Sequence, residues 1–304
     1  MIYKIIQRRK IFLSISILAV VASIAALIAW GLNFGVDFRG GSLLEVEFTG
    51  YQPTIAEIQD NLGAAGLHNL VIQPTEDSFI LRFKEDTEEA HQAALSGIET
   101  LISGKEEASF RELRLDAVGP AIGQELKSKS FNAGFIVLIM IIIYISAVFR
   151  KVSKPVASWK YGVTAIIALT HDVLITLGVF SLLGHFYGTE INTPFIAAIL
   201  TVLGYSVNDT IIVFDRIREN LPNSREDFEN TVNRSVNQTL SRSINTSASS
   251  ILVLLAIIFL GGATIKDFAL ALAIGIFIGT YSSIFVASPV LVIWDNLVRR
   301  ARKS

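Results

Sequence analysis

A carboxylate and an amide stand side by side near the end of a long apolar segment. Asn208 and Asp209 lie about four or five residues inside the end of a run that starts at Ile191. With Thr201 and Tyr205 they follow the spacing i, i+4, i+7 and i+8, which places all four on one stripe of a helix. An acidic side chain inside a membrane span costs about 2.5 kcal/mol or more and usually marks an ion pathway. Binding and release of a proton by Asp209 is the chemistry that this pattern indicates.

A second polar stripe occupies the start of the next apolar segment, at i, i+3, i+4, i+7 and i+8: Arg242, Asn245, Thr246, Ser249 and Ser250. A cation beside a carboxylate favours its ionised form, so movement of Arg242 relative to Asp209 would convert motion into proton affinity. Alternatively, Arg242 only extends its charged head to the membrane surface. The spacing alone favours neither interpretation.

A histidine and an aspartate are adjacent in the middle of a third apolar segment. His171 and Asp172 lie about ten residues from either end of the span 161–183, near the expected midplane of a bilayer. They could take part in proton transfer, or they could satisfy each other and only hold helices together. Both interpretations stay open from the sequence.

A membrane bundle must position these side chains. Of the 304 residues 51% are apolar, and six segments approach the ~20 residues that span a bilayer. Lys and Arg gather around both termini and in the connections that share their side, whereas the short opposite loops contain only Lys266. The positive-inside rule therefore places both termini in the cytoplasm. The predicted spans are 11–34, 131–149, 161–183, 191–214, 244–260 and 268–294.

The first apolar run is too long for the h-region of a signal peptide, so we expect it to remain as the first membrane helix. The chain has no cysteine, which excludes disulfides and thiol chemistry. No glycine-rich phosphate loop with lysine follows a predicted strand, which argues against nucleotide hydrolysis. We therefore expect no enzyme activity, no cofactor and no metal site.

Charged residues return between the first two spans. Their alternation predicts the order β-α-β-β-α-β, with strands at 42–48, 70–73, 79–83 and 110–118 and helices at 53–65 and 87–102. This order is the ferredoxin-like α+β arrangement. His68 and His91 look isolated, and the carboxylates are scattered over predicted helix faces, so no catalytic constellation is predicted here.

The fold class that follows is a polytopic α-helical membrane protein with six transmembrane helices and one extracytoplasmic domain between the first two. The expected domains are 1–34 (cytoplasmic N-terminus and first span), 35–127 (periplasmic ferredoxin-like domain), 128–298 (the other five spans) and 299–304 (a cytoplasmic basic tail). Within the bundle, a cytoplasmic amphipathic helix is expected at about 224–242. Ser224 and Asp227 would cap it, and its apolar face would lie along the membrane surface.

Four motifs resemble those of the SecF family, the membrane subunits that accompany SecD and the bacterial protein-export channel. They are Gly35-Val36-Asp37-Phe38-Arg39-Gly40-Gly41 and the stretches 118–123, 204–219 and 240–247, in the order and at the distances typical of the family. The sequence departs mildly from the pattern at Ser243 and Ser249, where threonine is more usual, and both keep a hydroxyl. The glycines at 35, 40 and 41 would form a tight turn, and we interpret Asp37 and Arg39 as structural charges rather than substrate contacts.

The resemblance implies a subunit of the resistance-nodulation-division superfamily in the bacterial inner membrane. Such a subunit works with SecD, the Sec channel and secretory polypeptides, uses the proton gradient, and binds no nucleic acid. It also implies that Asp209 and Arg242 couple proton movement, lined by Asn208, Tyr205, Thr201, Asn245, Thr246 and Ser249. Two alternatives remain: a proton-driven exporter of small solutes or lipids, and a non-transporting assembly subunit in which Asp209 only packs helices.

One more pattern concerns the last span. Small residues recur there at four-residue steps, followed by Pro289, which should kink the helix: Ala271, Gly275, Gly279, Ser283 and Ala287. Such a ridge lets two helix backbones approach closely. It could pack inside this chain's own bundle, or it could meet SecD.

Overall fold

The computed structural model describes residues 3–67, 70–75, 77–148 and 158–301. The chain divides into two compact units, one formed by Met1–Asn33 with Asn132–Ser304 and the other by Phe34–Phe131. Most of the basic connection predicted between the second and third spans, and residues 302–304 of the predicted tail, lie outside the described residues.

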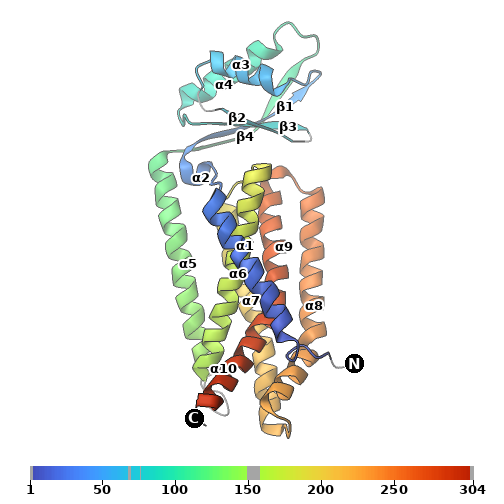
Figure 1. The fold of residues 1–304 in the computed structure, drawn as a ribbon. Coiled ribbons are helices and arrows are strands. Elements are labelled where there is room, and N and C mark those ends of the chain that lie inside the picture. Colours follow the sequence, from blue (N-terminus) through green and yellow to red (C-terminus); the bar gives the residue numbers. More distant parts are fainter. Residues whose placement is uncertain (1–2, 68–69, 76, 149–157, 302–304) are drawn as a thin grey trace. The chain divides into compact units, whose positions relative to one another are not determined.

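The first unit is a helical bundle (Figure 1). Among the described residues, six helices are long and apolar enough to cross a membrane, which confirms the predicted number of spans. The helices of the bundle are α1 (Arg9–Trp30), α5 (Pro120–Val148, whose residues from Asn132 onward belong to this unit), α6 (Ser158–Tyr187), α7 (Thr193–Asn220), η1 (Leu221–Asn223), α8 (Phe228–Leu260), α9 (Ala263–Ser282), η2 (Ser283–Ala287) and α10 (Ser288–Ala301).

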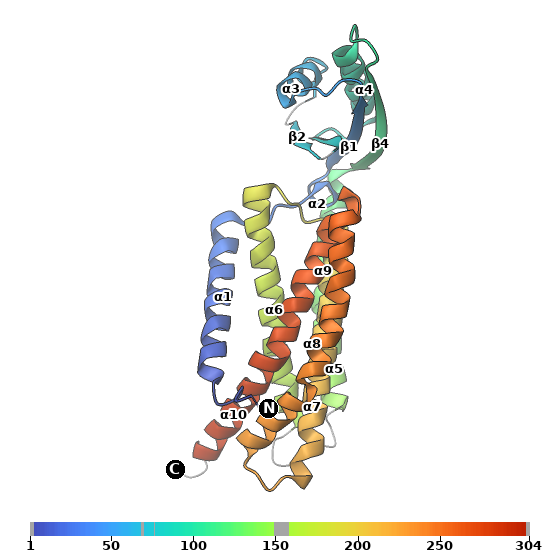
Figure 2. The same cartoon turned by 90° about the vertical axis from the view of Figure 1, so that its right-hand side faces the viewer.

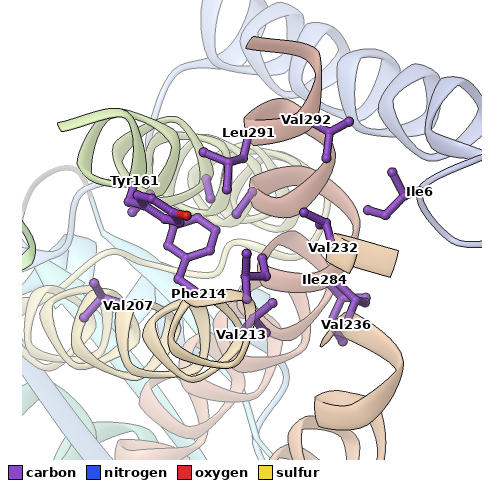
Figure 3. Packing of buried hydrophobic residues seen from close by; sticks show 14 of the residues in the cluster. Ile6, Tyr161, Val207, Val213, Phe214, Val232, Val236, Ile284, Leu291 and Val292 are labelled. Carbon is purple, nitrogen blue, oxygen red and sulfur yellow. The ribbon is translucent and has the colours of Figure 1, made fainter. Parts of the chain in front are cut away.

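Buried apolar side chains join six parts of the chain at one end of the bundle. Figure 3 shows Ile6, Val232, Val236 and Ile284 converging, while the rings of Tyr161 and Phe214 meet edge to face at 5.2 Å between centroids. These residues come from the N-terminal segment, α6, α7, α8 and η2, and α10 adds Leu291 and Val292, which are fully buried. Burial of this cluster fixes the helices relative to one another at this end.

The N-terminal segment binds to the first turns of α8. The backbone N–H of Ile6 donates to Asn233 Oδ1 at 3.1 Å, and Arg9 forms an ion pair with Glu229 at 2.6 Å. Figures 1 and 2 both show the two chain ends at the same end of the bundle. A common end is what an even number of crossings requires.

The expected surface helix at 224–242 is not a separate element. Helix α8 begins at Phe228 and continues without a break to Leu260, because no Gly or Pro interrupts its 33 residues. Its N-cap is Asp227, whose Oδ1 accepts the backbone N–H of Asn230 at 2.9 Å, so the expected cap at Ser224 was wrong. The apolar residues of its first turns are buried in the cluster of Figure 3.

The small-residue ridge of the last span packs inside the bundle. A Cβ added to Gly275 would lie 2.3 Å from Val202 Cγ2, and one added to Gly279 would lie 2.8 Å from Ser206 Cβ, both on α7. The suggestion that this ridge meets another subunit was therefore wrong, since α7 already covers it. Before Pro289 the helix widens into the π-helical turn η2 rather than only kinking, which accommodates the missing N–H of the proline.

The second unit consists of a four-stranded antiparallel sheet and two longer helices, in the order that the sequence predicts. The strands lie in the order β2-β3-β1-β4, so the first and third strands are central. Leu44 of β1 pairs with Leu81 of β3 and Leu115 of β4, and it packs with Ile58 and Ile98 of the helices. The elements are α2 (Val36–Arg39), β1 (Gly41–Thr49), α3 (Ile55–Ala64), β2 (Val71–Pro74), β3 (Ser78–Phe83), α4 (Glu88–Ile102) and β4 (Ser109–Val118).

The sequence predicts that both histidines of this unit are isolated, and the structure tests this prediction for one of them. His68 lies outside the described residues. His91 is not isolated, since its Nε2 lies 3.0 Å from Glu112 Oε2 and its Nδ1 lies 3.5 Å from Glu88 Oε1. Glu88 precedes His91 by three residues on α4, whereas Glu112 comes from strand β4, 21 residues further along the chain. Spacing along one element could not reveal the second contact.

The carboxylate of Glu57 is held at the start of α3 by several donors. Tyr51 donates its hydroxyl to Oε1 at 2.6 Å, the N–H and hydroxyl of Thr54 donate to Oε2 at 2.8 Å, and Lys105 lies 3.6 Å away. These groups, the Tyr51 hydroxyl first, lower the pKa of Glu57 from 4.5 to about 2. The Lys105 ammonium also lies 3.2 Å from the centre of the Tyr51 ring, which adds a cation–π contact.

Glu57→Gln should destabilise the second unit at neutral pH but not in strong acid. A carboxylate whose pKa is depressed on folding stabilises the folded state above its unfolded pKa of 4.5, and this contribution is lost as the pH falls towards about 2. Hydrogen exchange of residues 34–131 in the full chain should therefore be faster in the variant at pH 6, and the difference should shrink below pH 4.5. The matched control is Glu99→Gln on the exposed face of α4. A difference that stays constant with pH would contradict the account.

Candidate proton-binding site

Asp209 lies on the inward face of α7. Its side chain is 6% exposed, and Oδ1 accepts a hydrogen bond of 2.5 Å from the hydroxyl of Ser243 on α8. Oδ2 is buried and has no hydrogen-bond partner among the described residues. Buried polar atoms are nearly always paired, so a single free carboxylate oxygen inside a bundle is a place for a proton or a water molecule.

The predicted stripe around Asp209 divides between two environments. Tyr205 is half-buried and donates its hydroxyl to Ser247 at 3.4 Å, and Ser247 in turn lies 2.5 Å from Thr280 of α9. Asn208 and Thr201 are exposed on the side of α7 that no described helix covers. The stripe is therefore continuous along α7, but only part of it faces the interior.

The predicted stripe on α8 faces outward. Four of its five members are exposed: Arg242, Asn245, Thr246 and Ser249. The fifth, Ser250, is half-buried. No ion pair joins Arg242 to Asp209 among the described residues. The inward face is instead formed by Ser243 and Ser247, which the sequence reasoning missed. With Thr239 these hydroxyls also recur every four residues, so the signal was present but was one position away from the stripe that contains the arginine.

His171 and Asp172 lie on α6 and are both buried. Their side chains contact each other, with Nδ1 of the histidine 2.9 Å from Oδ1 of the aspartate. Oδ2 of Asp172 accepts hydroxyls from Ser206 of α7 at 2.6 Å and from Ser282 of α9 at 2.8 Å. Neither serine was predicted, because they reach Asp172 from 34 and 110 residues away in the sequence.

The glycine-rich motif at 35–41 forms the tight turn that its composition predicts. Val36–Arg39 is a single helical turn, and Gly40 and Gly41 have φ of +78° and +115°. A Cβ at Gly40 would lie 2.8 Å from the Cα of Pro120, and one at Gly41 would lie 2.6 Å from the carbonyl oxygen of Phe83. Both positions therefore need glycine for backbone conformation and for space.

Two motifs that resemble the SecF family pack against each other here. The position of a Cβ on Gly123 is 3.2 Å from the backbone of Asp37, Phe38 and Gly40. The stretch 118–123 thus closes on the turn at 35–41 across 80 residues of sequence. This contact explains why both motifs need small residues at these positions.

Comparison with known proteins gives the same family over nearly the whole chain. Residues 98–297 match the family described as protein export membrane protein SecD/SecF, C-terminal, and residues 26–50 match the SecD/SecF GG motif. The protein translocase subunit SecF of Thermobaculum terrenum is 40% identical over 96% of this chain and 94% of its own length. The chain belongs to the SecF family of protein translocase subunits. The resemblance drawn from the four motifs is thereby confirmed.

A further sequence relative and a solved structure support the same assignment. The SecF subunit of Desulfurispirillum indicum is 40% identical over 94% of this chain and 90% of its own length. The crystal structure of SecDF, a translocon-associated membrane protein from Thermus thermophilus, matches 97% of this SecF-family chain with a TM-score of 0.83 and 35% identity. The chain spans 39% of the length of that solved protein. A helical, multi-pass membrane protein of the protein-export machinery is the class that these similarities establish.

Proposed function

We propose that this chain works with a SecD-type partner and the Sec channel to promote export of secretory polypeptides, using the proton gradient across the bacterial inner membrane. The observation that supports the proposal best is Asp209, a buried carboxylate with one free oxygen inside the helical bundle. A carboxylate that only pinned helices would have both oxygens paired. Asp209 is therefore the proton-binding group in this account.

A SecD-type partner is supported by the polar face that α7 and α8 leave uncovered. We call this set the α7/α8 polar face: Thr201, Asn208, Arg242, Asn245, Thr246 and Ser249. The hydroxyls of Thr201 and Thr246 donate to carbonyls of their own helix at 2.8 Å, so lipid would tolerate them. The guanidinium and the two amides have no hydrogen-bond partner among the described residues, and lipid would satisfy none of them.

The relatives suggest what covers this face. The Thermus thermophilus relative is a SecDF subunit, and this chain aligns with only 36% of its length at 39% identity. A SecD-type half is thus fused to a SecF-type half in that protein. We place a SecD-type half against the α7/α8 polar face of the present chain.

Coupling would act through rotation of α8. Successive helical residues point about 100° apart, so a rotation of α8 by about this angle would replace the Ser243 hydroxyl at Asp209 with the guanidinium of Arg242. With serine opposite, the carboxyl can hold a proton on its free oxygen. With the guanidinium opposite, the ionised form is favoured and the proton is released. Arg242 therefore acts as a mobile charge in this proposal, and Asn208, Tyr205, Asn245, Thr246 and Ser249 line its path.

We also propose the orientation in the membrane. Both termini would be cytoplasmic, as the distribution of Lys and Arg requires. Residues 34–131 would then form the extracytoplasmic domain, and their strand order β2-β3-β1-β4 supports its assignment as ferredoxin-like. The predicted domain limits, including the basic tail at 299–304, belong to this proposal.

Export measured in inverted membrane vesicles tests the function. Vesicles that contain this chain with its SecD partner should take up more of a secretory precursor than vesicles without the chain. The gain should disappear when a protonophore removes the gradient. A gain of equal size with the protonophore would indicate the assembly role, and no gain alongside gradient-dependent efflux of a small solute would indicate the exporter.

Cross-linking tests the position of the partner. Because the chain contains no cysteine, Asn245→Cys introduces a single thiol into the α7/α8 polar face. A short thiol-reactive photo-cross-linker at this site should yield a product with SecD. The control is Leu18→Cys on α1, where the leucine is 70% exposed on an apolar surface and lipid is expected. Equal yields from both sites would contradict the assignment of this face.

A further inference from the structure

The buried pair on α6 is more than a contact between two neighbours. Asp172 is fully buried and accepts three hydrogen bonds, from His171, Ser206 and Ser282. Three donors satisfy an ionised carboxylate in the bundle interior without a Lys or Arg partner. His171 is different, since its Nε2 is buried and has no hydrogen-bond partner among the described residues.

Hydroxyl groups of two helices lead from this pair towards Asp209. On α7, Ser206 and Thr210 lie one turn apart, and Thr210 directly follows Asp209. On the facing helix, Ser282 and Ser283 are consecutive and point to different partners. Ser282 donates to Asp172, whereas the Ser283 hydroxyl lies 2.8 Å from that of Thr210 and 3.4 Å from the carbonyl of Ser206.

These polar groups lie in a row between the two sites, with an open atom at each end. One end is Nε2 of His171, and the other is Oδ2 of Asp209. The π-helical turn η2 begins at Ser283, whose hydroxyl contacts that of Thr210 on α7. Such turns are frequent at functional sites, because they let a helix adjust locally.

We propose that His171 and Asp172 form a second proton-binding site, coupled to Asp209 through the hydroxyls of Ser206, Thr210, Ser282 and Ser283. A proton from water would bind to the lone pair of Nε2 and convert the neutral imidazole into an imidazolium. Asp172, ionised throughout, would stabilise that cation through the Nδ1–H bond. One N–H bond forms at Nε2, and one O–H bond of the donating hydronium ion breaks, which leaves a water molecule. The inference rests on the proposed role of Asp209 in proton coupling.

The groups that face His171 from its neighbours are consistent with this role. Tyr281 of α9 stacks on the imidazole with ring centroids 6.3 Å apart, and its hydroxyl donates to the carbonyl of Phe12 on α1 at 2.9 Å. Ser16 of α1 lies 3.4 Å from the same hydroxyl. On α7 the buried ionisable side chain is Asp209. On α10 Asp295 influences Tyr161, ten residues away from His171 on α6. Among the described residues no Lys or Arg pairs with His171 or Asp172.

A purely structural pair would not require this histidine. Pinning α6 to α7 and α9 needs only Asp172 and its hydroxyl donors. Burying an unpaired acceptor such as Nε2 costs about 1–3 kcal/mol, which an apolar side chain at this position would avoid. A site that binds a proton at Nε2 gives that atom a function.

Infrared difference spectroscopy on the full chain in lipid vesicles, recorded during a pH titration, tests the proposal. His171→Asn places an amide near the position of Nδ1 and should abolish one imidazolium signal. His185→Asn, at the far end of the same helix, should leave that signal in place. Asp209→Asn should shift the midpoint of the His171 signal by about half a pH unit or more, a threefold change in proton affinity. No signal assignable to His171, or no shift, would overturn the inference.

Ser206→Ala tests whether the hydroxyls carry the coupling between His171 and Asp209. It removes one hydroxyl and keeps every ionisable group, so a large effect on folding is not expected. In the Ser206→Ala background, Asp209→Asn should shift the pH midpoint of the His171 imidazolium signal much less than it does in the wild type. This is the result of a double-mutant cycle in which Ser206 carries the coupling. An equal shift in both backgrounds would overturn the path through the hydroxyls. The readout is proton binding and not export, so it can succeed even where Asp209→Asn leaves export unchanged and the proposed function fails.

Discussion

Asp209→Asn should abolish the gradient-dependent part of precursor export and leave the gradient-independent part unchanged. Asparagine keeps the size of the side chain and can still accept the Ser243 hydroxyl, which now bonds Oδ1 at 2.5 Å. It cannot bind and release a proton. We expect at least a tenfold loss in the stimulation of export by the proton gradient, measured as uptake of a secretory precursor into inverted vesicles. The free Oδ2 becomes an amide, so a modest loss of stability is also expected.

The matched control for this prediction is Asp215→Asn, nearly two turns further along α7. Asp215 is half-buried and forms a local ion pair with Arg218 at 2.5 Å, so the same chemical change occurs on the same helix outside the site. Export by this variant should equal that of the wild type. If both variants export equally well with and without the gradient, Asp209 is a packing group and the chain is a structural subunit.

Gly275→Leu should prevent α9 from packing on α7 and unfold the bundle or lower its melting temperature strongly. A Cβ at this position would lie 2.3 and 2.7 Å from the two methyl carbons of Val202, which is itself 1% exposed. Overpacking a dense core costs about 1–3 kcal/mol for added methylenes, and here the backbones of two helices must also separate. Thermal unfolding in detergent, followed by the loss of soluble monomer, measures the effect.

Gly134→Leu on α5 is the comparison for that change. Nothing lies within 4 Å of a Cβ at Gly134, so leucine meets open space and the melting temperature should stay within a few degrees of the wild type. A similar loss at both positions would show only that leucine is not tolerated in place of helical glycine. An unchanged melting temperature for Gly275→Leu would contradict the close approach of α9 and α7.

The number of spans and the order of elements in the second unit followed from the sequence, because both depend on local patterns. Runs of apolar residues set the spans, and alternation with glycine stops set the strands and helices. The length of α8 did not follow. Ser224 looked like a cap and the polarity changed near Arg242, yet without a helix breaker the chain simply continued from Phe228 to Leu260.

Which face of each helix turns inward was harder to predict. Spacing shows that Arg242 and Asn245 share a face, but it does not show where that face points. In the structure the hydroxyl face of α8 meets Asp209, and the face with the arginine is exposed. A membrane subunit that lacks its partner can leave polar groups outside, so polarity alone did not identify the inner face. The roles of both residues stay predictions.

The environment of His171 and Asp172 depends on contacts that no local pattern contains. The serines that donate to Asp172 come from α7 and α9, and they can be recognised only when three helices are placed together. The small residues of the last span predicted a close contact with another helix. Their spacing alone could not identify which helix that is. The structure identifies it as α7.

Proton movement through the assembled complex tests the central claim most directly. Proteoliposomes that contain this chain and its SecD partner would carry an imposed pH gradient, and a trapped pH-sensitive dye would report its decay. The account predicts that wild type and Asp215→Asn dissipate the gradient at the same rate, and that Asp209→Asn dissipates it no faster than protein-free liposomes. Equal decay for Asp209→Asn and the wild type would contradict it, because protons would then cross without the carboxylate on α7.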